Sequence, residues 1–78
     1  MHKIILYTKN NCHLCDDMKV TLLRTLENIN AHLEIIDIES NEKLFEKYKH
    51  KIPVLTIDGN MFAKYRVDKE ELRKKLAG

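Results

Sequence analysis

Short apolar runs alternate with segments of helical periodicity along this chain. Residues 3–8 are continuously apolar at their centre, as is typical of a strand covered on both faces, and residues 33–38 form a second run of this kind. Between these runs, apolar residues recur at spacings of three and four, which predicts an amphipathic helix from about Cys12 to Leu26 or Glu27. The apolar row of that helix consists of Cys15, Met18, Leu22 and Leu26.

The second half of the chain repeats the alternation and adds a hairpin. Residues 40–49 are predicted to form a second helix with a narrow apolar face. Residues 54–57 and 60–63 are predicted strands, joined by Asp58-Gly59, a pair that supplies the two positive-φ positions of a tight turn. The side chain of Asp68 is predicted to cap the last helix. The order βαβαββα predicts an α/β fold with a mixed four-stranded sheet flanked by helices.

Length and composition narrow the classes of protein that are possible. The 78 residues, 44% hydrophobic and 33% charged, predict one globular domain over residues 1–78. The net charge of +2 and the few aromatic residues give no indication of nucleic-acid binding. The apolar run near the N-terminus is too short for a signal peptide or a membrane span, so we expect a cytoplasmic location and no association with membranes.

The candidate chemistry lies in the CxxC pair Cys12 and Cys15, directly after the first predicted strand. Two cysteines at this spacing can form a disulfide with little distortion of the backbone. Asn10 or Asn11 is predicted to cap the helix that starts there. Unpaired N–H groups and the positive end of the helix dipole favour a thiolate at a helix start, so Cys12 is interpreted as the nucleophile. Cys15 lies on the buried row and is interpreted as the resolving thiol.

A CxxC pair is also compatible with other chemistry. In a reducing compartment a lone pair is more often catalytic or metal-binding than structural. Zinc sites generally take four ligands, commonly from two such pairs, and this chain has no third cysteine. A module that binds a metal or an iron–sulfur cluster through Cys12, with or without Cys15, is the alternative interpretation. A redox-inert adaptor of the same fold would be expected to have lost the cysteine pair.

The chain resembles glutaredoxin-like proteins of the thioredoxin superfamily over essentially all of its residues. The resemblance rests on the Tyr-Thr-Lys-Asn-Asn-Cys-x-x-Cys segment at residues 7–15, on Ile52-Pro53-Val54 and on the order of the elements. It implies a thioredoxin-like fold with a cis peptide bond before Pro53, facing the cysteines. It further implies that the backbone of Ile52 pairs with the cysteine segment of a substrate. Lys9 stands where glutaredoxins carry a lysine that meets a glutathione carboxylate and favours the thiolate.

Several charged residues are expected near the cysteines. His13 would donate a hydrogen bond to the Cys12 thiolate or carry positive charge beside it, or would simply be exposed. If the proline loop faces Cys12, Lys49-His50-Lys51 adds positive charge to the same rim. Asp16 and Asp17, in the first turn of the predicted helix, would oppose formation of the thiolate.

The resemblance implies a dithiol–disulfide oxidoreductase that reduces protein or small-molecule disulfides. Glutaredoxins that use glutathione carry a Gly-Gly pair after the hairpin and an acidic residue at the last helix. Here Ala63-Lys64 occupy the place of that pair, the nearest acidic residue, Asp68, is slightly displaced, and Cys-His-Leu-Cys replaces the familiar Cys-Pro-Tyr-Cys. We expect no bound cofactor. We expect either glutathione or thioredoxin reductase as the electron donor. The expected partners of this monomer are disulfide-containing proteins and its reductant.

Overall fold

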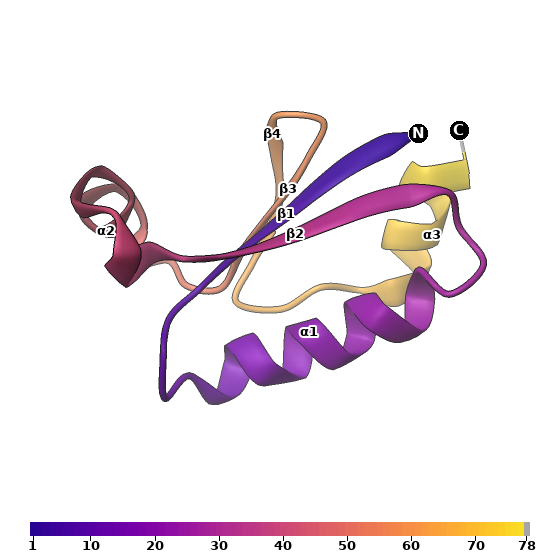
Figure 1. Ribbon diagram of the computed structural model, residues 1–78. Helices are drawn as coiled ribbons and strands as arrows, with labels where there is room; N and C mark the ends of the chain where they lie inside the picture. Colours follow the sequence, from indigo (N-terminus) through magenta and orange to yellow (C-terminus); the bar gives the residue numbers. More distant parts are fainter. Residues whose placement is uncertain (78) are drawn as a thin grey trace.

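A mixed four-stranded sheet forms the centre of the computed structural model, which describes residues 1–77 (Figure 1). The strands lie in the order β2-β1-β3-β4, and their bounds are β1 His2–Thr8, β2 Ala31–Asp37, β3 Val54–Ile57 and β4 Asn60–Lys64. The pairing of β1 with β2 is parallel, whereas β3 is antiparallel to both of its neighbours. Parallel neighbours require a crossover connection, and α1 (His13–Thr25) provides it. The predicted fold class is therefore confirmed.

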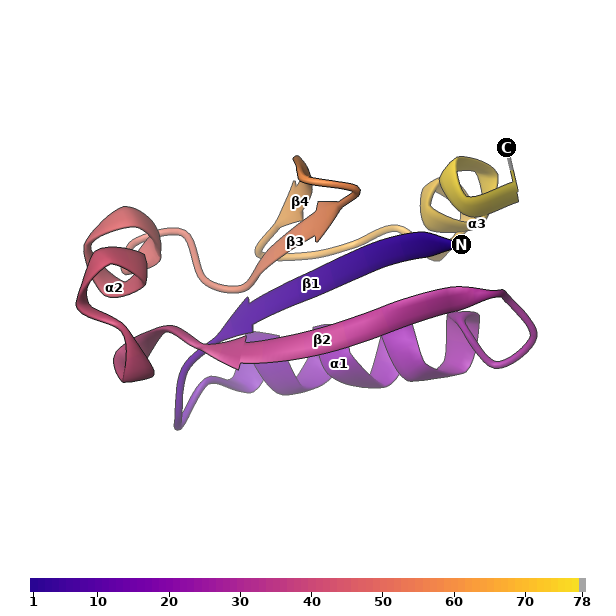
Figure 2. The ribbon, with the colours of Figure 1, turned by 45° about the horizontal axis from the view of Figure 1, so that its top comes forward.

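Helices α1 and α3 (Lys69–Ala77) cover the same face of the sheet (Figure 2). The predicted apolar row of α1 points inward, with Leu22 fully buried and Met18 nearly so. Burying a side chain of this size contributes roughly 1.5–3 kcal/mol relative to leaving it exposed. The main core cluster comprises Ile4, Leu6, Met18, Leu22, Leu55, Ile57, Leu72 and Leu76.

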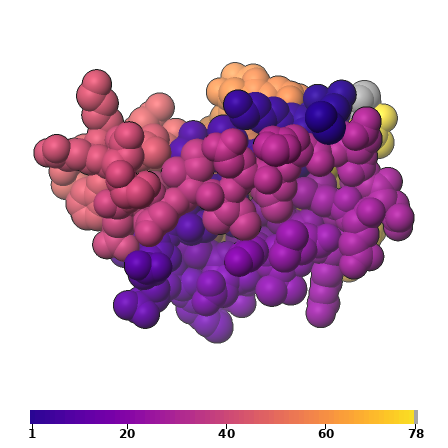
Figure 3. Space-filling model, in the orientation of Figure 1, coloured from indigo at the N-terminus to yellow at the C-terminus, as the bar shows by residue number. Residues whose placement is uncertain are grey.

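Helix α2 (Glu42–Tyr48) lies at one end of the sheet instead of across its face (Figures 1 and 3). In the space-filling view this part of the chain projects beyond the rest of the molecule. The principal extents of the whole described chain are 33 × 23 × 16 Å. The inward face of α2 belongs to a second, smaller core cluster, which also contains Cys15 and Ile52. This end of the sheet therefore carries both the cysteines and the proline loop.

Element boundaries differ from the predictions by a few residues, for local reasons. The second strand ends at Asp37, because the Asp37 side chain accepts a hydrogen bond from the Glu39 N–H (2.8 Å) and starts the 3₁₀ helix η1 (Ile38–Ser40). The second helix starts at Glu42 and not at Ser40, because the Asn41 side chain accepts from the Leu44 N–H (3.1 Å) and caps it. The first helix spans His13–Thr25, slightly less than predicted.

The predicted hairpin turn is confirmed, and it also anchors the N-terminal strand. Asp58 and Gly59 adopt φ values of 51° and 86°. The Asp58 carboxylate accepts hydrogen bonds from the Lys3 N–H (2.9 Å) and from the His2 ring (2.7 Å). These two interactions, with the Lys3 N–H as the larger cause, lower the pKa of Asp58 below its ordinary value of 3.8.

This anchor predicts a pH-dependent contribution to stability. A carboxyl group whose pKa is lower in the folded than in the unfolded protein stabilises the fold above its ordinary pKa, and that stabilisation is lost as the pH falls through the folded value. We expect D58N to be less stable than the wild type at neutral pH, and the difference to shrink below pH 3.8. Urea unfolding of D58N and of the wild type, at neutral pH and again below pH 3.8, measures the difference in their free energies of unfolding. An equal difference at both would show that the charge of Asp58 plays no part.

Candidate functional site

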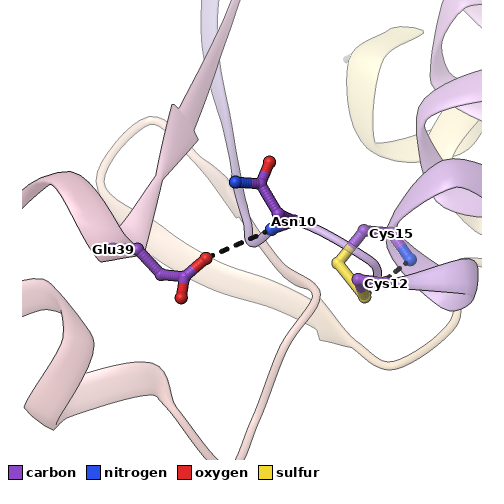
Figure 4. The surroundings of a disulfide bond; sticks show 4 residues. All are labelled: Asn10, Cys12, Cys15 and Glu39. Carbon is purple, nitrogen blue, oxygen red and sulfur yellow. Dashed lines mark hydrogen bonds between the residues drawn. A yellow bond between two sulfur atoms is a disulfide. The ribbon is translucent and has the colours of Figure 1, made fainter.

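The turn between β1 and α1 places Cys12 at the start of the helix. Asn11 adopts a left-handed conformation (φ 56°), which asparagine tolerates better than most residues, and it reverses the chain direction. The Asn10 N–H donates a long hydrogen bond to Glu39 Oε1 (3.4 Å), which links this turn to η1 (Figure 4). Glu39 of the 3₁₀ helix η1 therefore helps to hold the turn between β1 and α1 in place.

Cys12 itself is the N-cap of α1, so the prediction that Asn10 or Asn11 caps this helix is wrong. Cys12 has an extended conformation (φ −117°, ψ 104°), and its Sγ accepts a hydrogen bond from the Cys15 N–H at 3.1 Å. The left-handed Asn11 lies one residue too early to do this. The nucleophile candidate thus has its sulfur directed at the unpaired N–H groups of the helix start (Figure 4).

A disulfide joins Cys12 and Cys15, whose Cα atoms are 5.2 Å apart, within the usual range for such bonds. The two cysteines differ in exposure. Cys15 is 3% exposed and belongs to the smaller core cluster, whereas Cys12 is half-buried at its edge. The prediction that Cys15 turns inward is confirmed, and Cys12 is the sulfur that solvent reaches.

The proline loop lies against the cysteines. The Ile52-Pro53 peptide bond is cis, as the resemblance implied, and Ile52 packs in the same cluster as Cys15, with Cys12 packed against it. The loop is held at one end by the Lys51 N–H, which donates to the Tyr48 C=O (2.8 Å). Within residues 1–77, neither the N–H nor the C=O of Ile52 has a hydrogen-bond partner in the protein. A backbone edge is thus available beside the disulfide.

A pair of stacked tyrosines supports this end of the sheet. The ring centroids of Tyr7 and Tyr48 are 4.5 Å apart, with 28° between the ring planes. Burial raises the pKa of Tyr7, and the neighbouring Tyr48 raises it further, so the Tyr7 hydroxyl stays neutral at physiological pH. Sequence reasoning placed Tyr48 on an apolar face but missed this stack, whose only signal is that Tyr7 ends an apolar run.

Some of the charged residues expected near the cysteines pair with other groups. His13 is highly exposed, and its Nε2 lies 3.5 Å from an Asp17 carboxylate oxygen. Lys49 pairs with Glu46 at 3.2 Å. Lys9 is exposed on the turn before Cys12. The structure therefore places Lys9 and His13 next to the cysteine segment without a hydrogen bond from either to a cysteine sulfur in the part of the chain described.

A cavity of about 240 Å³ opens beside the CxxC segment, between α1 and the turn that follows β4. Tyr65 lines this cavity and has a left-handed backbone conformation (φ 68°). Sequence reasoning did not single it out, because a tyrosine gives no signal for a positive φ. The lining residues are Leu14, Asp17, Met18, Thr21, Tyr65, Arg66 and Val67.

Two features are absent from residues 1–77, the part of the chain that the structure describes. No group of three or more His, Cys, Asp or Glu residues lies close enough together to hold a metal ion, so the metal-binding alternative gains no support from the geometry. None of the helices in this range is both long and apolar enough to cross a membrane.

Comparisons with known proteins agree with the geometry. A family model described as "Glutaredoxin-like domain (DUF836)" matches residues 3–77. A "Glutaredoxin-like protein YDR286C homolog" from Dictyostelium discoideum is 32% identical over 72 residues, covering 85% of this chain and 67% of that protein. The solution structure of protein Ne2328 from Nitrosomonas europaea is 28% identical, with a TM-score of 0.81 over 96% of this chain and 91% of that one. A mutant thioredoxin from Halobacterium salinarum (19% identical, TM-score 0.72, 96% and 71% covered) shows the shared fold.

The difference in exposure predicts a difference in reactivity between the two thiols. After reduction, we expect iodoacetamide to alkylate Cys12 before Cys15, by on the order of tenfold or more, because Cys15 is buried and Cys12 sits at the helix start. A brief pulse of reagent followed by peptide mass spectrometry measures the two rates. Equal labelling in the folded protein, with full labelling of both in denaturant as control, would contradict this assignment.

Proposed function

This chain belongs to the glutaredoxin-like domain family of the thioredoxin superfamily, and from that premise we propose that it is a dithiol–disulfide oxidoreductase. One observation supports this proposal above the others: the Cys12 sulfur caps α1, beside a backbone edge at Ile52 that has no partner within residues 1–77. The first feature favours a thiolate, and the second offers a place for the chain that carries the substrate sulfur.

The proposed reaction is a two-step exchange. The Cys12 thiolate attacks one sulfur of the substrate disulfide, whose S–S bond breaks and releases the other sulfur as a thiolate. Cys15 then loses its proton and attacks Cys12 Sγ, which closes the Cys12–Cys15 disulfide and releases the second substrate thiolate. The substrate gains two electrons, and an external thiol reductant returns them to the pair.

The proline loop supplies the proposed substrate site. An extended substrate segment would donate to the Ile52 C=O and accept from the Ile52 N–H, which brings its cysteine towards Cys12. Ile52, joined to Pro53 by the cis peptide bond, packs in the same core cluster as Cys15. Lys9 and His13, exposed on the neighbouring turn and helix start, would meet acidic groups of the substrate or of glutathione.

The proposed partners and setting follow from this chemistry. Disulfide-containing proteins and small disulfides would be the substrates, and glutathione or a thioredoxin reductase the electron donor. A dithiol that must return to its reduced state suits a reducing compartment, so we place the protein in the cytoplasm, as a monomer contributing to electron transport and redox homeostasis. No bound cofactor is needed, because both electrons are carried by the sulfurs of Cys12 and Cys15.

Serine variants of the two cysteines test the proposal. We expect C12S to lower reduction of a disulfide-linked peptide, with dithiothreitol as reductant, to the uncatalysed rate, because a serine hydroxyl does not attack a disulfide. C15S, reduced and then freed of dithiothreitol before the peptide disulfide is added, should stall at a mixed disulfide between Cys12 and the peptide, visible as a mass increase of the intact protein. L23A, which changes an exposed residue on the outer face of the same helix, is the matched control and should retain wild-type turnover. Turnover by C12S at the wild-type rate would exclude Cys12 as the nucleophile.

A further inference from the structure

Tyr65 has a backbone conformation that is costly for its residue type. Its φ of 68° lies in the left-handed region, which favours glycine. The Arg66 N–H donates to the Lys64 C=O (2.8 Å) and closes a three-residue turn centred on Tyr65. A γ-turn with positive φ at its centre is rare and strained. Strain of this kind persists where the surrounding structure imposes it, and it is concentrated at functional sites.

Two hydrogen bonds fix Tyr65 to both ends of the proline loop. Its N–H donates to the Pro53 C=O (2.8 Å), and its side-chain hydroxyl donates to the His50 C=O (2.8 Å). One residue therefore spans residues 50–53, the segment that contains Ile52. Because the backbone is bound at one end and the hydroxyl at the other, the ring lies alongside this segment.

Tyr65 also shares a cavity with one of the two residues that separate the cysteines in sequence. Tyr65 and Leu14, which stands between Cys12 and Cys15, line the same cavity of about 240 Å³. Tyr65 is 43% exposed, and the Lys64 ammonium group is 5.8 Å from its ring centroid. The ring thus forms the rim between the helix that carries the cysteines and the loop with which a substrate would pair.

We propose that Tyr65 determines which thiols reach the dithiol, selecting protein thiols against the tripeptide glutathione. This inference rests on the proposed function and specifies its electron donor. A glycine at this position would let a small peptide approach the loop backbone closely, whereas the tyrosine ring occupies that space. A tripeptide that loses these contacts keeps only those of its acidic groups with Lys9 and His13. A protein segment that pairs with Ile52 continues past the ring and gains contacts with it and with Leu14.

The discriminating reaction is reduction of the Cys12–Cys15 disulfide by glutathione. One glutathione thiolate attacks Cys12 Sγ, the disulfide breaks, and Cys15 leaves as a thiolate that takes a proton. A second glutathione thiolate attacks the sulfur of the bound glutathione and releases the Cys12 thiolate. The protein gains two electrons, and two glutathione molecules become one glutathione disulfide.

The experiment compares two rate constants for each variant of the oxidised full-length protein. Reduction by glutathione reports access of the tripeptide, and reduction by dithiothreitol, which makes no peptide contacts, reports the intrinsic reactivity of the disulfide. Acid quenching and alkylation of the free thiols, followed by measurement of the intact mass, give both rate constants. We expect the ratio of the glutathione to the dithiothreitol rate constant to rise about tenfold or more in Y65G and Y65A, a typical effect of one subsite. In Y65F, which keeps the ring, the ratio should stay at the wild-type value.

Matched variants separate this role from a structural one. M61A alters an exposed residue of β4, the strand that ends just before Tyr65, and should leave the ratio unchanged. Y65A retains a Cβ at the left-handed position but lacks the ring, so a rise confined to Y65G would assign the effect to backbone strain and overturn the proposal. An equal rise in Y65F would assign it to the hydroxyl bond with His50 and would also overturn it.

Two further outcomes distinguish failure of this inference from failure of the proposed function. An unchanged ratio in both Y65G and Y65A, with normal reduction of a peptide disulfide in the presence of dithiothreitol, overturns the role of Tyr65 and leaves the oxidoreductase standing. If the wild type does not reduce the peptide disulfide at all, the proposed function fails and this inference falls with it. Circular dichroism shows whether each variant is folded. If Y65G does not fold, the comparison of Y65A with the wild type tests the proposal.

Discussion

The hydrogen bond from the Cys15 N–H to Cys12 Sγ is the contact around which the site is organised. It makes a sulfur the cap of α1, at a position where serine, threonine, aspartate or asparagine would cap more strongly. The helix can accept this weaker cap because its packing is fixed elsewhere. Met18 and Leu22 hold α1 against the sheet, and Cys15 continues the same buried row into the smaller cluster. The core thus determines where the helix lies, and the helix start determines where the reactive sulfur lies.

Sheet register brings the second half of the site to the same place. Strands β1 and β3 are antiparallel, and Tyr7 pairs with Val54. The residues that follow Tyr7 and those that precede Val54 therefore leave the sheet at one edge, which is why Cys12 and Pro53 meet although they are far apart in sequence. The stack of Tyr7 on Tyr48 fills the space beneath this meeting point and joins α2 to the sheet. A register shift of one residue would turn these side chains to the opposite face and separate the two parts of the site.

The features that sequence reasoning predicted are those set by local patterns. Periodicity and the Asp68 cap located every α-helix and strand within a few residues but not the 3₁₀ helix η1, Asp58-Gly59 identified the turn, and the row through Cys15 identified the buried cysteine. The cap was missed because the left-handed Asn11 depends on how the turn closes against a segment distant in sequence, through Asn10 and Glu39. Tyr65 was missed for a similar reason.

The conformation of Tyr65 is imposed by tertiary contacts, and no residue-type rule predicts a tyrosine there. Its bonds to Pro53 and His50 exist only once the proline loop is in place. Resemblance indicated the cis peptide bond, but it directed attention to Ala63-Lys64 as the substitute for a glycine pair. The left-handed position lies one residue further on. The departure from the glutaredoxin pattern at Ala63-Lys64 thus pointed to this turn, and the backbone conformation singles out Tyr65 within it.

The charges around Cys12 differ greatly in their expected effect on the thiolate. Asp17 and its partner His13 are both largely exposed, and such pairs contribute little because water and salt screen them. The Cys15 N–H is 3.1 Å from the sulfur and is fixed by the helix, so it needs no reorganisation to stabilise negative charge there. We therefore expect this N–H to favour the thiolate of reduced Cys12 more than the exposed Asp17–His13 pair opposes it. In the proposed oxidoreductase the reactivity of Cys12 would rest on the helix start, and selection among substrates would fall to the backbone of Ile52 and to Tyr65.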